Sequence, residues 1–129
     1  MSVWRRKALE AFPESRTAIQ SCDSPVALWI ELEDGFDSAL KNSDPEAASR
    51  FFEFARWCRK DSKNEDVATA AWTVFYEHLP KRKRSWSLVA ALITSSEFHE
   101  LSEAFQYLAS EHEFEEFVAY YKTHRKPPF

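Results

Sequence analysis

The sequence predicts an all-α fold, and three observations predict it. The 129 residues include a single glycine, Gly35, although an average chain of this length contains about nine. Tight β-hairpins and bulges depend on glycine, so its scarcity disfavours β structure. Apolar residues recur at helical spacing along most of the chain, and no segment alternates with period two for long enough to form a strand.

The first half of the chain contains several recognisable helix starts. One helix is expected from Val3 to Phe12, followed by a short, weak one over 13–21. Ser24-Pro25 starts the next, because serine caps a helix and proline fits its first turn. Ser43-Asp44-Pro45 starts another in the same way. Gly35 falls inside the helix that begins at Pro25, and the simplest explanation is close packing against a bulky neighbour.

The second half continues the pattern. A helix beginning at Asn64 is apolar around most of its circumference, so we expect it to be the most buried helix, and Pro80 should end it. Ser85 is expected to cap a short helix over 86–93. Thr94-Ser95-Ser96-Glu97 and Ser110-Glu111-His112-Glu113 are capping boxes, and each should start a helix.

These segments predict a single domain over residues 1–124, built as an antiparallel array or bundle of six to seven short helices. Residues 125–129 should form a flexible C-terminal tail. The residues expected at the centre of the core are Trp29, Phe51, Phe54, Trp72 and Phe75.

Several classes of function are disfavoured by composition. Glycine-rich nucleotide loops are excluded, because a lone glycine cannot supply them. No apolar run approaches the roughly 20 residues of a membrane span, and the basic N-terminus lacks the apolar segment of a signal peptide. Cys22 and Cys58 are too few for a disulfide framework, which indicates a reducing compartment, and we expect the cytoplasm. Cys58 should be buried and Cys22 exposed.

The histidines do not form a metal or catalytic motif. None of the four follows the Glu-x-x-His or His-Glu-x-x-His pattern. We therefore expect no metal and no cofactor, and the sequence leans against an enzyme. One segment still merits a hypothesis: His78 shares a helix side with Val67 and should be partly buried, where it would act as a general base or as a structural hydrogen-bonding group. The corresponding candidate pocket consists of Trp57, Tyr76, Glu77 and His78.

Charge is unevenly distributed along the chain. The net charge is −4, and residues 85–121 contain seven acids but neither lysine nor arginine. This pattern fits either an ordinary solvated surface or an acidic helical face that contacts a partner. The candidate partner-binding residues are Glu100, Glu103, Glu111, Glu113, Glu115 and Glu116.

The basic residues are also clustered. They form runs at 5–7, at 81–84 and around 122–126, with a further group over 56–63. Binding of nucleic acid would require these groups to converge on one face. The negative net charge disfavours it, so nucleic-acid binding ranks third among the functions considered, and we regard a nucleic-acid partner as unlikely.

Trp57-Cys58 at one helix end and Phe75-Tyr76-Glu77-His78-Leu79-Pro80 at the next resemble a family of small, all-helical bacterial proteins without an assigned function. The resemblance implies a helical fold in the bacterial cytoplasm and carries over no catalytic residue. Small acidic helical proteins of this kind also resemble immunity proteins. The leading expectation is a non-catalytic protein-interaction module, regulatory or immunity-like, with a protein partner. A small-ligand-binding or enzymatic domain with a pocket near His78 is the alternative.

Overall fold

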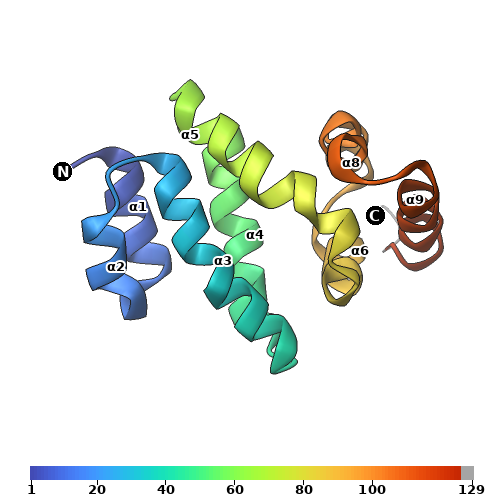
Figure 1. The fold of residues 1–129 in the computed structure, drawn as a ribbon, viewed down its shortest axis with the longest axis horizontal. Coiled ribbons are helices and arrows are strands. Elements are labelled where there is room, and N and C mark those ends of the chain that lie inside the picture. The colour runs from blue at the N-terminus through green and yellow to red at the C-terminus, as the bar shows by residue number, and fades with distance from the viewer. Residues whose placement is uncertain (126–129) are drawn as a thin grey trace. The chain divides into compact units, whose positions relative to one another are not determined.

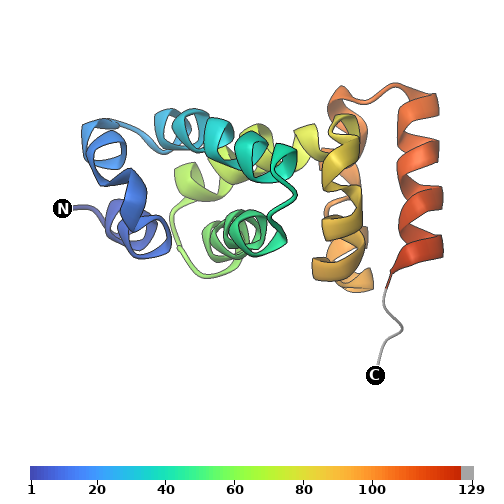
Figure 2. The same ribbon diagram turned by 90° about the horizontal axis from the view of Figure 1, so that it is seen from below.

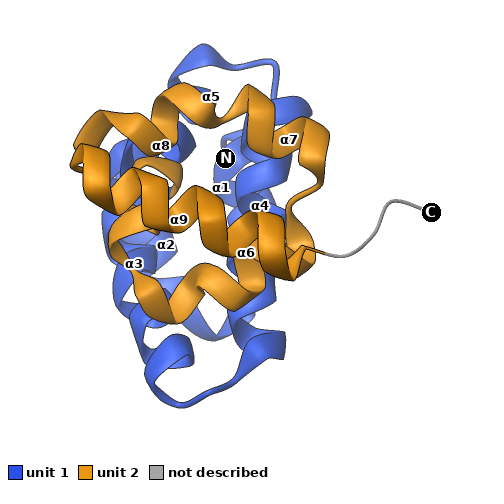
Figure 3. Cartoon of the chain, turned by 90° about the vertical axis from the view of Figure 1, so that its right-hand side faces the viewer, with its two compact units in different colours: residues 1–75 blue, residues 76–129 orange. Residues whose placement is uncertain are grey.

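The computed structural model describes residues 1–125, and over this range it confirms the all-α class. Every regular element between residues 1 and 125 is helical (Figure 1). The chain divides into two compact units, which we call the first unit (residues 1–75) and the second unit (from residue 76 onward), and each has its own colour in Figure 3. Whether 1–124 behaves as one domain stays a prediction, and the tail over 126–129 lies outside the described residues.

Five α-helices and two other helical segments make up the first unit. They are α1 (Val3–Ala11), the 3₁₀ turn η1 (Pro13–Ser15), α2 (Arg16–Ser21), α3 (Pro25–Lys41), α4 (Pro45–Lys60), α5 (Glu65–Ala70) and the π-helical segment η2 (Ala71–Phe75). Helix α4 packs against α1, α3, α5 and η2, so it lies at the centre of this unit.

The helix starts of the first unit lie where the sequence predicts them. The Ser24 hydroxyl accepts a hydrogen bond from the Ala27 backbone N–H, and the Asp44 carboxylate accepts one from the Ala47 backbone N–H. Side-chain acceptors of this kind satisfy N–H groups that have no partner within the helix. Asn64 caps α5 in the same manner.

An aromatic core holds the first unit together. The rings of Phe36 and Trp29 lie 5.1 Å and 5.2 Å from that of Phe75. The packing explanation for Gly35 is confirmed, because a Cβ atom there would lie 3.2 Å from Phe51 Cζ. Of the five expected core residues, only Trp72 is half-buried rather than buried.

Within residues 76–125, the second unit has four α-helices and two 3₁₀ segments. They are η3 (Tyr76–Lys81), η4 (Lys83–Ser85), α6 (Trp86–Leu92), α7 (Ser95–Glu100), α8 (Ser102–Leu108) and α9 (Glu111–His124). Helix α9 packs against α6, α8 and η3, and Figure 2 shows α9 beside α6. The ring of Phe98 stacks on that of Tyr121 at 3.9 Å, and the Tyr121 hydroxyl donates to the Ile93 carbonyl. Both predicted capping boxes are present, at Thr94 and Ser110.

Four local expectations are wrong. Pro80 does not end the helical path but lies inside η3; proline has no N–H for an α-helical bond, and the chain here has already left the α-helical pattern. The helix expected to start at Thr94 ends after Glu100, because Leu101, which is fully buried, has ψ near 3° and separates α7 from α8. Ser85 precedes α6 without capping it, since its hydroxyl bonds the Arg82 carbonyl. Cys22 is buried, and its thiol bonds the Ala18 carbonyl.

Candidate functional site

All six candidate partner-binding acids belong to the second unit. Glu100 ends α7, Glu103 lies in the first turn of α8, and the other four are on α9. Glu113 is half-buried and the other five are exposed. The structure therefore places all six carboxylates within reach of solvent.

The basic loop before α6 neutralises part of this acidic set. Lys81 Nζ lies 3.1 Å from Glu113 Oε1, and Lys83 Nζ lies 3.6 Å from Glu116 Oε2. His112 Nε2 lies 2.8 Å from the other oxygen of Glu116. The Ser110 backbone N–H and the Lys81 ammonium both donate to Glu113, and these bonds lower the pKa of its carboxyl. Charges that are separate in the sequence are thus partly paired in the fold.

Helical periodicity divides the acids of α9 into two groups. The buried stripe of α9 includes Phe117 and Tyr121. At about 100° per residue, Glu111 and Glu115 lie on one side of that stripe, whereas the ion-paired Glu113 and Glu116 lie on the other. Within residues 1–125, Glu111 and Glu115 make no side-chain hydrogen bond or ion pair, and the same holds for Glu103 on α8.

An exposed apolar pair lies at the end of α8, the helix that carries Glu103. Tyr107 is 74% exposed and Leu108 is 39% exposed, both at the end of α8. Tyr107 follows Glu103 by one turn of α8, and Glu111 and Glu115 follow on α9 after the two-residue connection 109–110. We call this set the Tyr107 surface, and its members are Glu103, Tyr107, Leu108, Glu111 and Glu115. Neither residue was a candidate from the sequence, because the spacing of Leu108 from Leu101 and Phe105 predicts a buried stripe residue, whereas Leu108 is 39% exposed.

The four residues of the predicted pocket come from both units. Trp57 lies on α4, whereas Tyr76, Glu77 and His78 form the start of η3. His78 is partly buried, as expected. Glu77 is only 7% exposed, and burial raises the pKa of its carboxyl. A common pocket for the four stays a prediction.

Trp57 lines two surface hollows of the first unit, and Tyr76, Glu77 and His78 line neither. One has a volume of about 420 Å³ and is lined by Lys7, Glu10, Ala11, Arg50, Glu53, Phe54 and Trp57. The other has a volume of about 440 Å³ and is lined by Ser2, Val3, Trp4, Trp57, Asp61, Ser62, Lys63, Asn64 and Val67. Trp4 was not among the residues expected at a site, although it directly precedes the basic run at 5–7.

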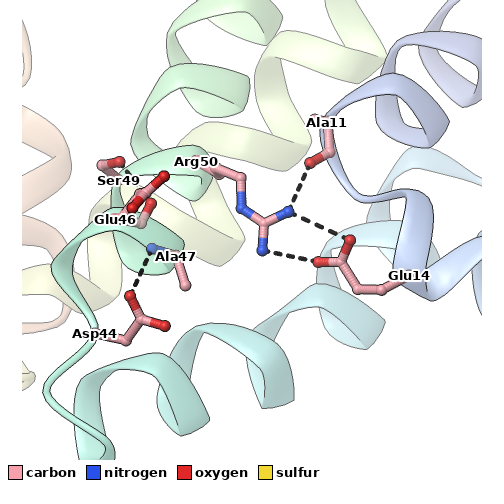
Figure 4. Close-up of polar contacts among 7 residues, drawn as sticks. All are labelled: Ala11, Glu14, Asp44, Glu46, Ala47, Ser49 and Arg50. Carbon is pink, nitrogen blue, oxygen red and sulfur yellow. Dashed lines mark hydrogen bonds and ion pairs between the residues drawn. The ribbon is translucent and has the colours of Figure 1, made fainter.

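Arg50 fixes one side of the first hollow. Its guanidinium extends from α4 to the end of α1, where Nη1 donates to the Ala11 carbonyl at 3.2 Å (Figure 4). The same group forms a two-pronged ion pair with Glu14, with the closest N–O distance 2.9 Å. Both terminal nitrogens of the Arg50 guanidinium therefore already have partners, so Arg50 connects α4 to the end of α1 rather than offering a group to a ligand. We call this set of contacts the Arg50 brace.

The part of the chain that the structure describes contains neither a metal-binding cluster nor a membrane-spanning helix. Across residues 1–125, no three or more His, Cys, Asp or Glu side chains are grouped so that they could hold a metal ion. None of the helices in that range combines the length and the apolarity needed to traverse a bilayer. No protein-family model, curated protein or solved structure matches the chain. The resemblance based on Trp57-Cys58 and residues 75–80 stays a prediction.

Proposed function

We propose that the chain is a non-catalytic protein-interaction module that binds a basic protein partner through the Tyr107 surface. The observation that supports this most directly is the 74% exposure of Tyr107 one helical turn from Glu103, a carboxylate that no basic group of the described chain neutralises. Tyrosine is enriched in protein interfaces, where it buries a large area at little cost in side-chain entropy.

The charges around Tyr107 favour a particular kind of partner. Unpaired carboxylates attract lysine- and arginine-rich surfaces and increase the rate at which such partners associate. Glu113 and Glu116 already have cationic partners, so they should add little to binding. The proposal therefore narrows the predicted acidic face to Glu103, Glu111 and Glu115.

A regulatory or immunity-like role in the bacterial cytoplasm belongs to the same proposal. Both cysteines are free and buried, which is compatible with a reducing compartment. The alternative is that the Tyr107 surface is ordinary solvated surface, and a binding experiment distinguishes the two.

The test compares three tagged proteins in affinity capture from a lysate of the source cells at moderate salt. The first is wild type. The second carries Glu103→Lys, Glu111→Lys and Glu115→Lys. The third carries Glu31→Lys, Asp34→Lys and Glu53→Lys, which reverse exposed, unpaired acids of the first unit and change the net charge equally.

A true partner should bind wild type and the control variant but not the variant reversed at the Tyr107 surface. With that partner purified, Tyr107→Ala should weaken binding by roughly tenfold or more, the size typical of a central interface aromatic. Circular dichroism confirms that each variant is folded. Equal capture by all three proteins would remove the Tyr107 surface from consideration.

A further inference from the structure

Two basic segments that are far apart in the sequence lie close together in the first unit. Residues 3–7 belong to α1 and residues 56–63 span the end of α4, and these two helices pack against each other. Together the segments contain seven basic residues and one acid, whereas the whole chain has a net charge of −4. The basic residues are Arg5, Arg6, Lys7, Arg56, Arg59, Lys60 and Lys63.

A hollow with two indole walls lies between these segments. Trp4 comes from α1 and Trp57 from α4; both are half-buried and both line the hollow of about 440 Å³. Val67 contributes a buried apolar wall. The two indoles make no ring contact with each other, although the Trp57 ring stacks on that of Phe54 with centroids 6.0 Å apart. The volume falls in the range of about 300–1,000 Å³ that is usual for ligand sites.

Cations lie directly beside both indoles. The Arg5 guanidinium lies 4.5 Å from the ring centre of Trp4, and the Lys7 ammonium lies 5.9 Å from that of Trp57. Bonds to the Ser2 hydroxyl and the Cys22 carbonyl hold Arg5 in position. Lys63 is a further member of the lining, and its ammonium has no ion pair among the described residues.

We propose that this hollow binds single-stranded nucleic acid. A base would stack on Trp4 or Trp57, and the adjoining phosphates would meet Lys63 in the lining and Lys7 beside Trp57, where Lys7 would exchange its 3.8 Å ion pair with Glu10 for a phosphate. Aromatic side chains that stack bases, combined with basic groups along the backbone, are the general means of binding single strands. In a duplex the base faces are already stacked, so the indoles favour a single strand. A free nucleotide offers the same chemistry, and the experiment separates the two.

This inference is independent of the proposed protein-binding function. It uses only residues of the first unit, whereas the Tyr107 surface belongs to the second. The proposed site also does not require all the basic runs to converge on one face. The run at 81–84 takes no part in it, and Lys81 and Lys83 are paired with acids of α9.

The test measures binding of a fluorescein-labelled single-stranded oligonucleotide of about 15 nucleotides by anisotropy, at salt near 50 mM and near 200 mM. Wild type should bind and should lose tryptophan fluorescence as the bases stack. Trp4→Ala should weaken binding by roughly tenfold, because base stacking is lost. Trp4→Phe keeps an aromatic face and should restore most of the affinity.

A charge test uses two double variants with equal net charge. Lys7→Glu with Lys63→Glu should weaken binding by about tenfold and reduce the salt slope by about 1.4, as expected for two lost phosphate contacts. Lys41→Glu with Lys122→Glu reverses exposed lysines elsewhere and should change affinity less than about twofold. Circular dichroism and thermal unfolding show that the variants are folded.

Four results would overturn the proposal. The first is unchanged anisotropy at low salt. The second is equal weakening by both double variants, which would show generic electrostatics. The third is equal binding of duplex and single strand. The fourth is competition by adenosine monophosphate as strong as by the oligonucleotide, which would make the hollow a site for free nucleotides.

Discussion

Glu77 is a carboxyl group that water barely reaches. Its side chain has no hydrogen bond or ion pair with any residue in 1–125, and burial raises the pKa of the carboxyl above its ordinary 4.5. The charged form is therefore less stable in the folded protein than in the unfolded one. Below pH 4.5 the Glu77 carboxyl is protonated in both the folded and the unfolded state, so its burial does not reduce the free energy of unfolding. As the pH rises through the folded-state pKa, the unfolded state is favoured and this stability is lost.

Replacing Glu77 by Gln should therefore stabilise the protein at neutral pH and have little effect near pH 4, because the amide stays neutral and keeps the same shape. Urea unfolding at both pH values measures the difference in free energy. Glu103→Gln, at an exposed and unpaired acid, is the matched control and should be neutral at both. A loss of stability in Glu77→Gln at pH 7 would show that the carboxylate has a favourable partner.

The turn between α3 and α4 has the hydrogen bonds of a Schellman motif. The Ser43 N–H bonds the Leu40 carbonyl and the Asp44 N–H bonds that of Ala39. This motif needs a left-handed residue at its centre, usually glycine, and Ser43 takes that conformation with φ of 52°. A serine there carries the strain of its Cβ against the backbone.

Ser43→Gly should accordingly stabilise the protein by about 1 kcal/mol, since glycine adopts this conformation without strain. Chemical denaturation measures the change. Ser21→Gly, within the last turn of α2, is the control and should destabilise, because glycine weakens a helical position. A destabilised Ser43→Gly variant would mean that the gain in unfolded-chain entropy outweighs the strain.

The helix starts could be predicted from the sequence because capping is local chemistry. Ser24, Asp44, Asn64, Thr94 and Ser110 each bond an N–H within three residues, so the pattern is visible in a short window. The course of the chain from Ala71 to Lys81 could not be predicted. There the backbone passes from π-helical to 3₁₀ turns, and helical periodicity assumes a constant α-helical pitch.

The candidate sites depend on packing across long stretches of sequence, and the sequence revealed less of them. The pairing of Lys81 with Glu113 joins residues separated by 32 positions. The placement of Trp4 beside Trp57 requires α1 to lie against α4. Charge runs and aromatic residues can be counted in the sequence, but only the tertiary fold shows which charges neutralise each other and which surround a hollow.

At the scale of the whole molecule, each unit has its own aromatic core. Phe36, Phe75 and Trp29 form ring contacts in the first unit, and Phe98 and Phe117 do so in the second. Most helices pack against neighbours in the sequence, and such local contacts favour fast folding. The Arg50 brace is different, because it connects residues 36 and 39 positions apart.

That separation gives the brace a kinetic consequence. Arg50 and Glu14 are partly exposed. Their ion pair can form only after the helices between them have packed, so we expect it to form after the folding transition state. Arg50→Ala should then speed unfolding by roughly fivefold, equivalent to about 1 kcal/mol, and leave the refolding rate unchanged. Stopped-flow measurements of the folding and unfolding rates against denaturant concentration test this. The control is Arg16→Ala, which removes an exposed arginine in the first turn of α2. Slower refolding of Arg50→Ala would instead show that the brace is already formed in the folding transition state. The lifetime of the folded first unit would then depend on other bonds.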